Sequence, residues 1–220
     1  MIIQQTSCKQ CGICCTKGGP ALHGADIDLL RQGSIPRKNL ITIRKGEFAY
    51  NPVAEMVQAT QSEIVKLKGS GGDWTCCYYD PESQGCSIYD NRPLACVILQ
   101  CWNPDATLAL VEKDLLSRLD IVSGDKFLVK LITEYELACP LPDCEKLSID
   151  LQNNSESMIA NLEDLVNRDL QFRNNVVAGS DTVLDEEMFL FGRPLFQIVQ
   201  SFGLLVSQYE NRLRLKMKKL

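Results

Sequence analysis

Histidine is almost absent from this sequence, whose 220 residues include one, His23. Zinc sites usually combine cysteine with histidine, and imidazole also suits copper, nickel and many iron sites. A metal site in this chain would therefore have to be built almost entirely from cysteine. The sequence also lacks any apolar run of the roughly 18–20 residues that a membrane-spanning helix requires. We therefore expect no interaction with a membrane.

Positive charge is also limited. The chain carries 23 Lys and Arg against 28 Asp and Glu, which gives a net charge of −5. Such a molecule repels the phosphate backbone of nucleic acids, and the basic stretches at 44–45 and 212–219 are too short to reverse this. Nucleic acid is therefore not an expected partner. The first ten residues lack the basic and then apolar pattern of a secretory signal, so we expect a cytoplasmic protein with reduced thiols.

Cysteine is the residue that the sequence has in excess, with 11 in total. Two clusters lie about sixty residues apart in the sequence, and an outlying pair follows them. The first cluster is Cys8, Cys11, Cys14 and Cys15, the second is Cys76, Cys77, Cys86, Cys96 and Cys101, and the pair is Cys139 and Cys144. An odd count and two sequence-adjacent pairs argue against a disulfide framework.

The first cluster has the spacing of a metal-binding loop, Cys8-x-x-Cys11-Gly12-x-Cys14-Cys15. Two-residue gaps let successive thiolates turn back onto one centre, and Gly12 permits the tight backbone that such a loop needs. Crowded thiolates are unfavourable unless a cation neutralises them. We therefore predict a metal centre that joins the two clusters within one compact fold.

The sequence leaves the identity of the metal open. A [4Fe–4S] cluster commonly takes three cysteines from one Cys-x-x-Cys-x-x-Cys loop and a fourth from elsewhere. The first three cysteines have this spacing, and Cys86 or Cys96 would be the remote ligand. In a ferredoxin, the third cysteine of the loop is followed after three further residues by Cys-Pro. Here Cys15 follows Cys14 directly, so a simple ferredoxin is not indicated. Seven or eight thiolates would alternatively hold two zinc ions, and a metal-free thiol role is the third alternative. The loop spacing favours one or two iron–sulfur clusters.

Local patterns predict an α+β fold in two parts. Residues 1–106 are predicted to form an irregular cysteine-rich metal domain with short hairpins. One hairpin is expected to pair 40–44 with 47–50, and another is expected to pair 63–68 with 74–79 around a glycine-rich turn at 69–72. The second hairpin would deliver Cys76 from a sheet edge. A short helix at 93–99, begun by Pro93, would carry Cys96.

Residues 107–220 are predicted to form a mainly α-helical supporting region packed on the first part. Apolar residues recur at helical spacing in 108–121, 125–138 and 155–172, and a final helix is predicted from Pro194 to 216. This region contributes only Cys139 and Cys144 as soft ligands. We therefore expect it to support the metal site by packing, not by coordination.

The two motifs together resemble a known family. Cys8-Lys9-Gln10-Cys11-Gly12-Ile13-Cys14-Cys15, then Cys76, Cys86-Ser87-Ile88-Tyr89 and Arg92-Pro93-Leu94-Ala95-Cys96, are similar to the CxxCxxCC family of zinc- or iron-chelating proteins, also called YkgJ-like cysteine-cluster proteins. The resemblance covers roughly residues 8–101. It implies metal-binding positions at Cys8, Cys11, Cys14, Cys15, Cys76, Cys86 and Cys96, and it leaves Cys77, Cys101, Cys139 and Cys144 outside the pattern.

A similar domain in flagellin lysine methylases implies an iron–sulfur cluster. This sequence has no motif for a methyl donor, so the resemblance assigns no catalytic residue and leaves enzymatic activity undecided. The expected function is to hold an iron–sulfur cluster that serves redox chemistry or organises a site for an unknown protein partner or substrate. A zinc-stabilised interaction module without redox chemistry is the alternative, and a metal carrier is a further one.

A few other side chains near the clusters have both chemical and structural interpretations. His23 would be a ligand or proton carrier, but a loop histidine is more often structural. Arg92 is suited either to offsetting the charge of a thiolate cluster or to meeting a carboxylate such as Asp90. The aromatic residues of the second cluster are expected to pack over the cysteines: Tyr78, Tyr79 and Tyr89.

Overall fold

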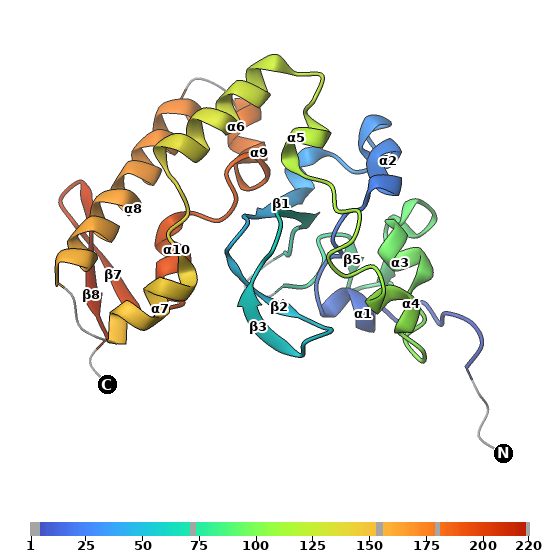
Figure 1. Cartoon of the computed structure of the whole chain (residues 1–220). Helices are drawn as coiled ribbons and strands as arrows, with labels where there is room; N and C mark the ends of the chain where they lie inside the picture. The colour runs from blue at the N-terminus through green and yellow to red at the C-terminus, as the bar shows by residue number, and fades with distance from the viewer. Residues whose placement is uncertain (1–4, 71–73, 153–155, 179–180, 219–220) are drawn as a thin grey trace.

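The computed structural model describes residues 5–70, 74–152, 156–178 and 181–218. Short helices and strands of the N-terminal half lie at one end, and long helices with a terminal hairpin lie at the other (Figure 1). The predicted α+β class is therefore confirmed. None of the helices in the described part of the chain is long and apolar enough to cross a membrane.

The N-terminal half consists of many brief elements. In chain order they are α1 (Ile13–Thr16), η1 (Gly24–Asp26), α2 (Ile27–Arg31), η2 (Arg37–Asn39), β1 (Leu40–Ile43), β2 (Phe48–Asn51), β3 (Met56–Ala59), β4 (Ile64–Leu67), β5 (Tyr79–Asp80), β6 (Gly85–Cys86), η3 (Tyr89–Asn91), α3 (Leu94–Ile98) and α4 (Asp105–Leu108). The predicted short helix at 93–99 corresponds to α3, with Pro93 as its N-cap.

The predicted hairpin of 40–44 with 47–50 is wrong. Strand β1 pairs instead with β4 in antiparallel register, and β2 pairs with β3. All four residues of β1 are buried, whereas β2 is half-exposed. A strand buried on both faces needs a partner that also enters the core, and β4 supplies this through Val65 and Leu67.

Strand β4 also makes part of the second predicted hairpin. Gly69 pairs with Cys76, and the Cys77 amide donates to the Lys68 carbonyl at 3.0 Å. The pairing is confined to this short segment, and positions 71–73 of the predicted turn and strand lie outside the described residues. The result nevertheless places Cys76 beside the end of a sheet strand, as the pattern predicted.

The C-terminal half contains the longer helices. They are α5 (Arg118–Ile121), α6 (Lys126–Ala138), α7 (Cys144–Gln152), α8 (Glu156–Val177), α9 (Asp181–Leu190) and α10 (Leu195–Gln200), followed by β7 (Leu204–Tyr209) and β8 (Arg212–Met217). Helix α6 matches the prediction for 125–138, because Asp125 caps it by accepting from the amides of Phe127 and Leu128. Helix α8 extends beyond the predicted 155–172, whose first residue lies outside the described ones.

The predicted single helix at 108–121 is wrong. The structure has α4 and α5 with turns between them, and Glu112 and Asp114 adopt positive φ of 62° and 47°. The segment is held against the N-terminal half, since the Leu116 amide donates to the Leu22 carbonyl at 3.0 Å. This long-range backbone pairing overrides the helical spacing of the apolar residues.

The predicted helix from Pro194 to 216 is also wrong in its second half. Helix α10 ends at Gln200, Gly203 turns the chain with φ 83°, and β7 and β8 form a hairpin. The hairpin packs on α8, where Asn167 exchanges two hydrogen bonds with the backbone of Leu213. The alternation of Leu213, Leu215 and Met217 is a strand pattern that serves this contact.

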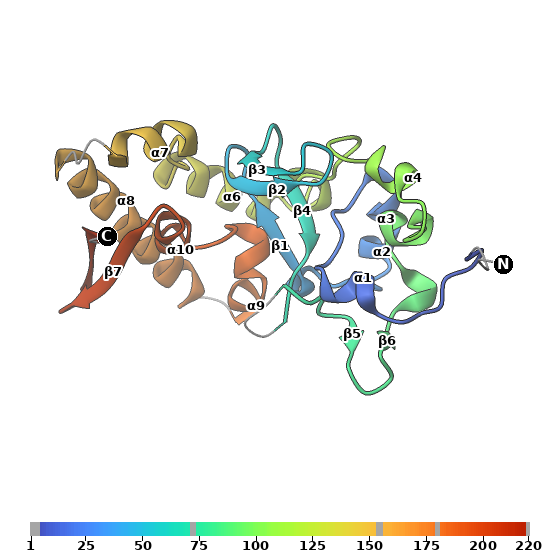
Figure 2. The same ribbon diagram turned by 90° about the horizontal axis from the view of Figure 1, so that it is seen from below.

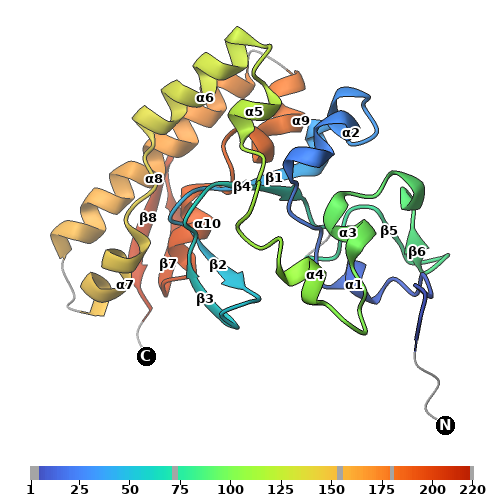
Figure 3. The same cartoon turned by 45° about the vertical axis from the view of Figure 1, so that its right-hand side comes forward.

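One hydrophobic core connects the two halves of the chain. Its buried members include Leu22, Leu40, Val65, Leu67 and Cys76 from the first half and Leu131, Ile132, Tyr135, Phe189 and Phe191 from the second. Figures 2 and 3 show α9 of the C-terminal half next to β1 of the N-terminal half. A second core cluster lies among α7, α8, α10 and the terminal hairpin. Cys76 of the second cysteine cluster therefore lies in the same core as helices of the C-terminal half.

Buried ion pairs reinforce this junction. Arg118 pairs with Glu63 before β4 and with Glu136 on α6, at 2.6 and 2.7 Å. Arg44, which follows β1, also pairs with Glu136. Removing one partner of such a network leaves a buried charge uncompensated, so these residues fix β1 and β4 against α6.

Candidate metal centre

Gly12 seats the N-terminal cysteine loop against the hairpin of β5 and β6. Its φ is 70°, and a Cβ atom at this position would overlap the ring of Tyr79 and lie 2.8 Å from the Gln84 carbonyl oxygen. A larger residue would therefore force the loop away from this hairpin. The loop then enters α1, which carries Cys14 and Cys15.

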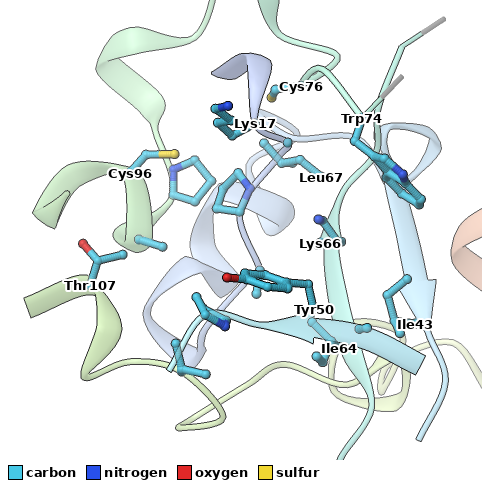
Figure 4. Close-up of a pocket in the computed structure, with 18 of the residues that line it drawn as sticks. Lys17, Ile43, Tyr50, Ile64, Lys66, Leu67, Trp74, Cys76, Cys96 and Thr107 are labelled. Atoms are coloured by element: carbon cyan, nitrogen blue, oxygen red, sulfur yellow. The ribbon is translucent and has the colours of Figure 1, made fainter. Parts of the chain in front are cut away.

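Five thiols from the two sequence clusters line one cavity of about 700 Å³. They are Cys14 and Cys15 from α1, Cys76 from the bridge that follows β4, Cys86 from β6 and Cys96 from α3. Figure 4 shows Cys76 and Cys96 directed toward this cavity from different segments. The backbone joins the clusters too, because the Cys76 amide donates to the Cys15 carbonyl at 2.8 Å.

The surroundings of four of these cysteines oppose ionisation. Burial, followed by the charge of Cys14, raises the pKa of both Cys15 and Cys96 to about 12. Burial also raises the pKa of Cys86, and a hydrogen bond with Cys77 followed by burial raises that of Cys76. At each of these four, the charge of a neighbouring cysteine raises the pKa further. A cation bound among them would reverse this, which is the behaviour expected of a metal–thiolate donor set.

Two sequence-predicted ligands lie away from this wall. Cys8 and Cys11 are exposed in the loop before α1 and do not line the cavity. The Cys8 Sγ accepts a hydrogen bond from the Gln10 amide at 3.4 Å. The loop therefore brings Cys14 and Cys15 to the second cluster while its first two cysteines face solvent.

The four cysteines outside the family pattern occupy varied positions. Cys77 is next to Cys76, and its thiol donates to the Asn39 carbonyl at 3.9 Å. Cys101 is exposed, whereas Cys139 and Cys144 are buried in the two separate hydrophobic clusters. None of the four lines the cavity that the five thiols share.

Within the described ranges, no group of three or more Cys, His, Asp and Glu residues is arranged so that it could hold one metal ion. The five cysteines that line the cavity are called its thiol wall below. Their chemistry suits soft metals, because thiolates are the preferred ligands of zinc and of iron–sulfur clusters.

Comparison with known families matches residues 7–113 to the CxxCxxCC model, described as a putative zinc- or iron-chelating domain. These residues form a CxxCxxCC domain. The match includes both cysteine clusters and ends in the segment between α4 and α5. No curated protein and no solved structure matches the chain. The family description supports metal binding by the cysteines and names zinc and iron without choosing between them.

Arg92 of the CxxCxxCC domain carries a buried donor without an acceptor. Its guanidinium lies over the Tyr89 ring at 3.5 Å, and its Nε is buried with no hydrogen-bond partner in the described part of the chain. Burial raises the pKa of Cys86, and the charge of Arg92 opposes that shift. No ion pair with Asp90 occurs among the described residues. An unsatisfied N–H beside thiols fits an anionic metal–thiolate centre.

His23 has a structural place in the domain. It is buried, and its Nδ1 donates to the Lys113 carbonyl at 2.9 Å, because a carbonyl can only accept. Its backbone amide donates to Asp26 at 2.9 Å. The bond to Lys113 joins the segment after α1 to the turns before α5.

Sequence reasoning missed the part of the cavity that lies beyond the thiols. Lys66 on β4 and Trp74 line the same cavity as Cys76 and Cys96. The alternation of β4 places Lys66 on the face opposite Val65 and Leu67. No motif in the sequence indicates that this face meets a cavity, because the opposing wall comes from residues distant in the chain.

Proposed function

We propose that the CxxCxxCC domain holds a [4Fe–4S] cluster on cysteine thiolates, in a redox or site-organising role. The observation that carries this proposal is the meeting of Cys14 and Cys15 with Cys76, Cys86 and Cys96 on one cavity wall. Metal binding by clustered cysteines agrees with the family description. The bound cluster would supply one-electron transfer or an iron site for a ligand.

The loop spacing supports iron over zinc. Three cysteines at the spacing of Cys8, Cys11 and Cys14 suit the loop of a [4Fe–4S] site, with Cys86 or Cys96 as the remote ligand. Each ligand sulfur of a cluster binds a different iron, so these sulfurs stand farther apart than the four ligands of one zinc ion. The five cysteines line one cavity but do not surround a single ion within the described residues.

The charge around the wall also supports a metal–thiolate cluster. A cluster with four thiolate ligands carries negative charge, and hydrogen bonds to its sulfurs stabilise it. Arg92 offers a buried Nε–H that no group in the described residues accepts. The remaining thiols of the wall would serve as further ligands, including those of a second cluster.

The test is the metal content of the chain purified without oxygen. The proposal predicts a brown protein with about four iron and four sulfide ions per cluster and a paramagnetic signal after reduction. A colourless protein with stoichiometric zinc and no sulfide would contradict it. That result would establish the zinc-stabilised interaction module instead.

A further inference from the structure

The cavity beside the cysteine wall continues into an apolar chamber. Strands β1 to β4 and Trp74 form its other walls, and Lys66 directs its amine into it between Tyr50 and Trp74, with Cys96 on the opposite side (Figure 4). The volume of about 700 Å³ is in the range of small-molecule sites. The cavity as a whole, including the part lined by the thiols, is therefore large enough for an organic ligand.

The rim of this chamber exposes apolar side chains. Tyr50 and Val57 face each other across β2 and β3 and are 62% and 57% exposed. Both line the cavity. Exposed apolar residues gathered at the mouth of a cavity are a common feature of binding sites. A ligand with an apolar body would cover them.

Lys66 is the polar group best placed to recognise such a ligand. Its amine lies 5.6 Å from the centre of the Trp74 ring, and no carboxylate pairs with it in the described residues. Burial lowers the pKa of Lys66, although the charge of Cys76 opposes that shift. An anion in the chamber would stabilise the charged amine.

Arg92 also lines the cavity, but its guanidinium lies over the Tyr89 ring, near Cys86. The remaining charged side chains of the lining pair with other groups or are exposed to solvent. Arg193 pairs with Glu47, and Glu112 accepts from the Asn51 amide at 3.3 Å. Lys17 is exposed to solvent. One amine in apolar surroundings suits a singly charged carboxylate, whereas a phosphate requires several donors. The flanking aromatic rings favour a flat apolar body.

We propose that this chamber binds a small organic acid, with its flat apolar body against the aromatic side chains of the lining and its carboxylate on Lys66. The proposal extends the proposed function by naming the class of ligand that the metal centre would face. It requires a ligand site next to the thiol wall and does not depend on which metal the wall binds.

The test compares acids with their uncharged amides on the full chain purified without oxygen. The probes are phenylacetate and indole-3-acetate, each paired with its amide, and binding is measured by calorimetry. A charge-assisted hydrogen bond in a dry site predicts that each acid binds about tenfold or more tightly than its amide. Equal affinities within each pair, or no saturable binding of either acid, would overturn the proposal.

Variants locate the site. Lys66→Met is expected to abolish the preference for the acids, and Lys66→Arg is expected to retain most of it because the charge remains. Lys38→Met is the matched control, since it removes an exposed lysine that does not line the cavity. An unchanged preference in Lys66→Met would overturn the assignment to this amine. The comparison in the unmodified chain decides the proposal if a variant fails to fold.

Metal content measured on the same samples separates the two proposals. The Lys66→Met chain is expected to keep its metal, because the amine is not a ligand of the thiol wall. A chain that prefers the acids but contains neither iron nor sulfide would contradict the iron–sulfur function and leave the chamber assigned. A chain with full iron and no preference for the acids would overturn the assignment of the chamber and leave the iron–sulfur function in place.

Discussion

The backbone amide of Cys76 donates a hydrogen bond to the carbonyl of Cys15 at 2.8 Å. This bond joins two cysteine clusters that lie far apart in the sequence, and it holds the end of α1 against the segment that follows β4. The side chains of both residues line the same cavity. The metal centre proposed here therefore depends on a contact between distant segments as well as on local cysteine spacing.

Gly12→Ala is expected to disturb the metal centre. The new methyl group would overlap Tyr79 and approach the Gln84 carbonyl, and the positive φ of 70° adds strain. We predict a lower Tm and less metal per chain than in the unmodified protein. Both quantities are measured after purification without oxygen.

Gly33→Ala is the matched control for that substitution. Gly33 has a similar φ of 75°, but no atom lies within 4 Å of the position of a new Cβ. The free energy of unfolding of Gly33→Ala should fall only by the cost of a non-glycine residue at positive φ, about 1–2 kcal/mol, and the variant should keep its metal. Equal metal contents in the two variants would show that the contact of Gly12 with the hairpin does not hold the site.

Cys8→Ser and Cys11→Ser test the exposed part of the loop. Both residues belong to the spacing that predicts the cluster, although they face solvent in the structure. If the loop supplies three ligands, each substitution should strongly reduce bound iron, because a lost ligand opens the coordination of one iron. Full iron content in both variants would assign the ligands to the five thiols of the cavity wall alone.

The local patterns were most reliable where the cause was local. Helix α6 was predicted from apolar spacing within one segment, and the structure adds Asp125 as its N-cap. The short helix that carries Cys96 was predicted from Pro93, which is also a local signal. The cysteine motifs and the family resemblance named all five residues of the thiol wall, together with Cys8 and Cys11, which do not line the cavity.

Long-range contacts account for what the sequence could not reveal. Strand β1 selects β4 because both of its faces are buried, and the segment at 108–121 is unwound by its backbone bonds to residues near Leu22. The terminal hairpin forms against Asn167 on α8. The chamber at Lys66 could not be predicted from the sequence, because its walls come from segments that meet only in the folded chain.

The cap of α5 predicts a pH-dependent stability. Hydrogen bonds from the Ser117 side chain and amide lower the pKa of Asp120 below its ordinary value of 3.8. A lowered folded-state pKa contributes stability above that ordinary value, and the contribution is lost as the pH falls through the folded pKa. Asp120→Asn should therefore be less stable than the unmodified chain at pH 6, with the difference shrinking toward pH 2.

Urea denaturation at several pH values checks this prediction. Asp28→Asn is a control, because Asp28 forms an exposed ion pair with Arg31 that contributes little. A stability difference for Asp120→Asn that stays constant from pH 6 to pH 2 would contradict the role assigned to its carboxylate.

Arg92→Met is expected to make the reduction potential of the bound cluster more negative. The variant lacks the positive charge that would stabilise the additional electron, and it lacks the buried Nε–H that has no acceptor within the described residues. Arg92→Lys should restore part of the potential by restoring the charge, and Arg31→Met, which removes an exposed arginine, should leave it unchanged. Identical reduction potentials in Arg92→Met and the unmodified chain would show that Arg92 does not influence the bound cluster.

The central claim is that both cysteine clusters hold one iron–sulfur centre. Its most direct test is the iron and sulfide content per folded chain in Cys14→Ser, Cys86→Ser and Cys96→Ser, with Cys101→Ser as the control that does not line the cavity. We predict that Cys14→Ser and at least one of the other two variants lose the cluster while folding is retained, and that the control keeps it. Full iron and sulfide in both Cys86→Ser and Cys96→Ser, with loss only in Cys14→Ser, would contradict a shared centre.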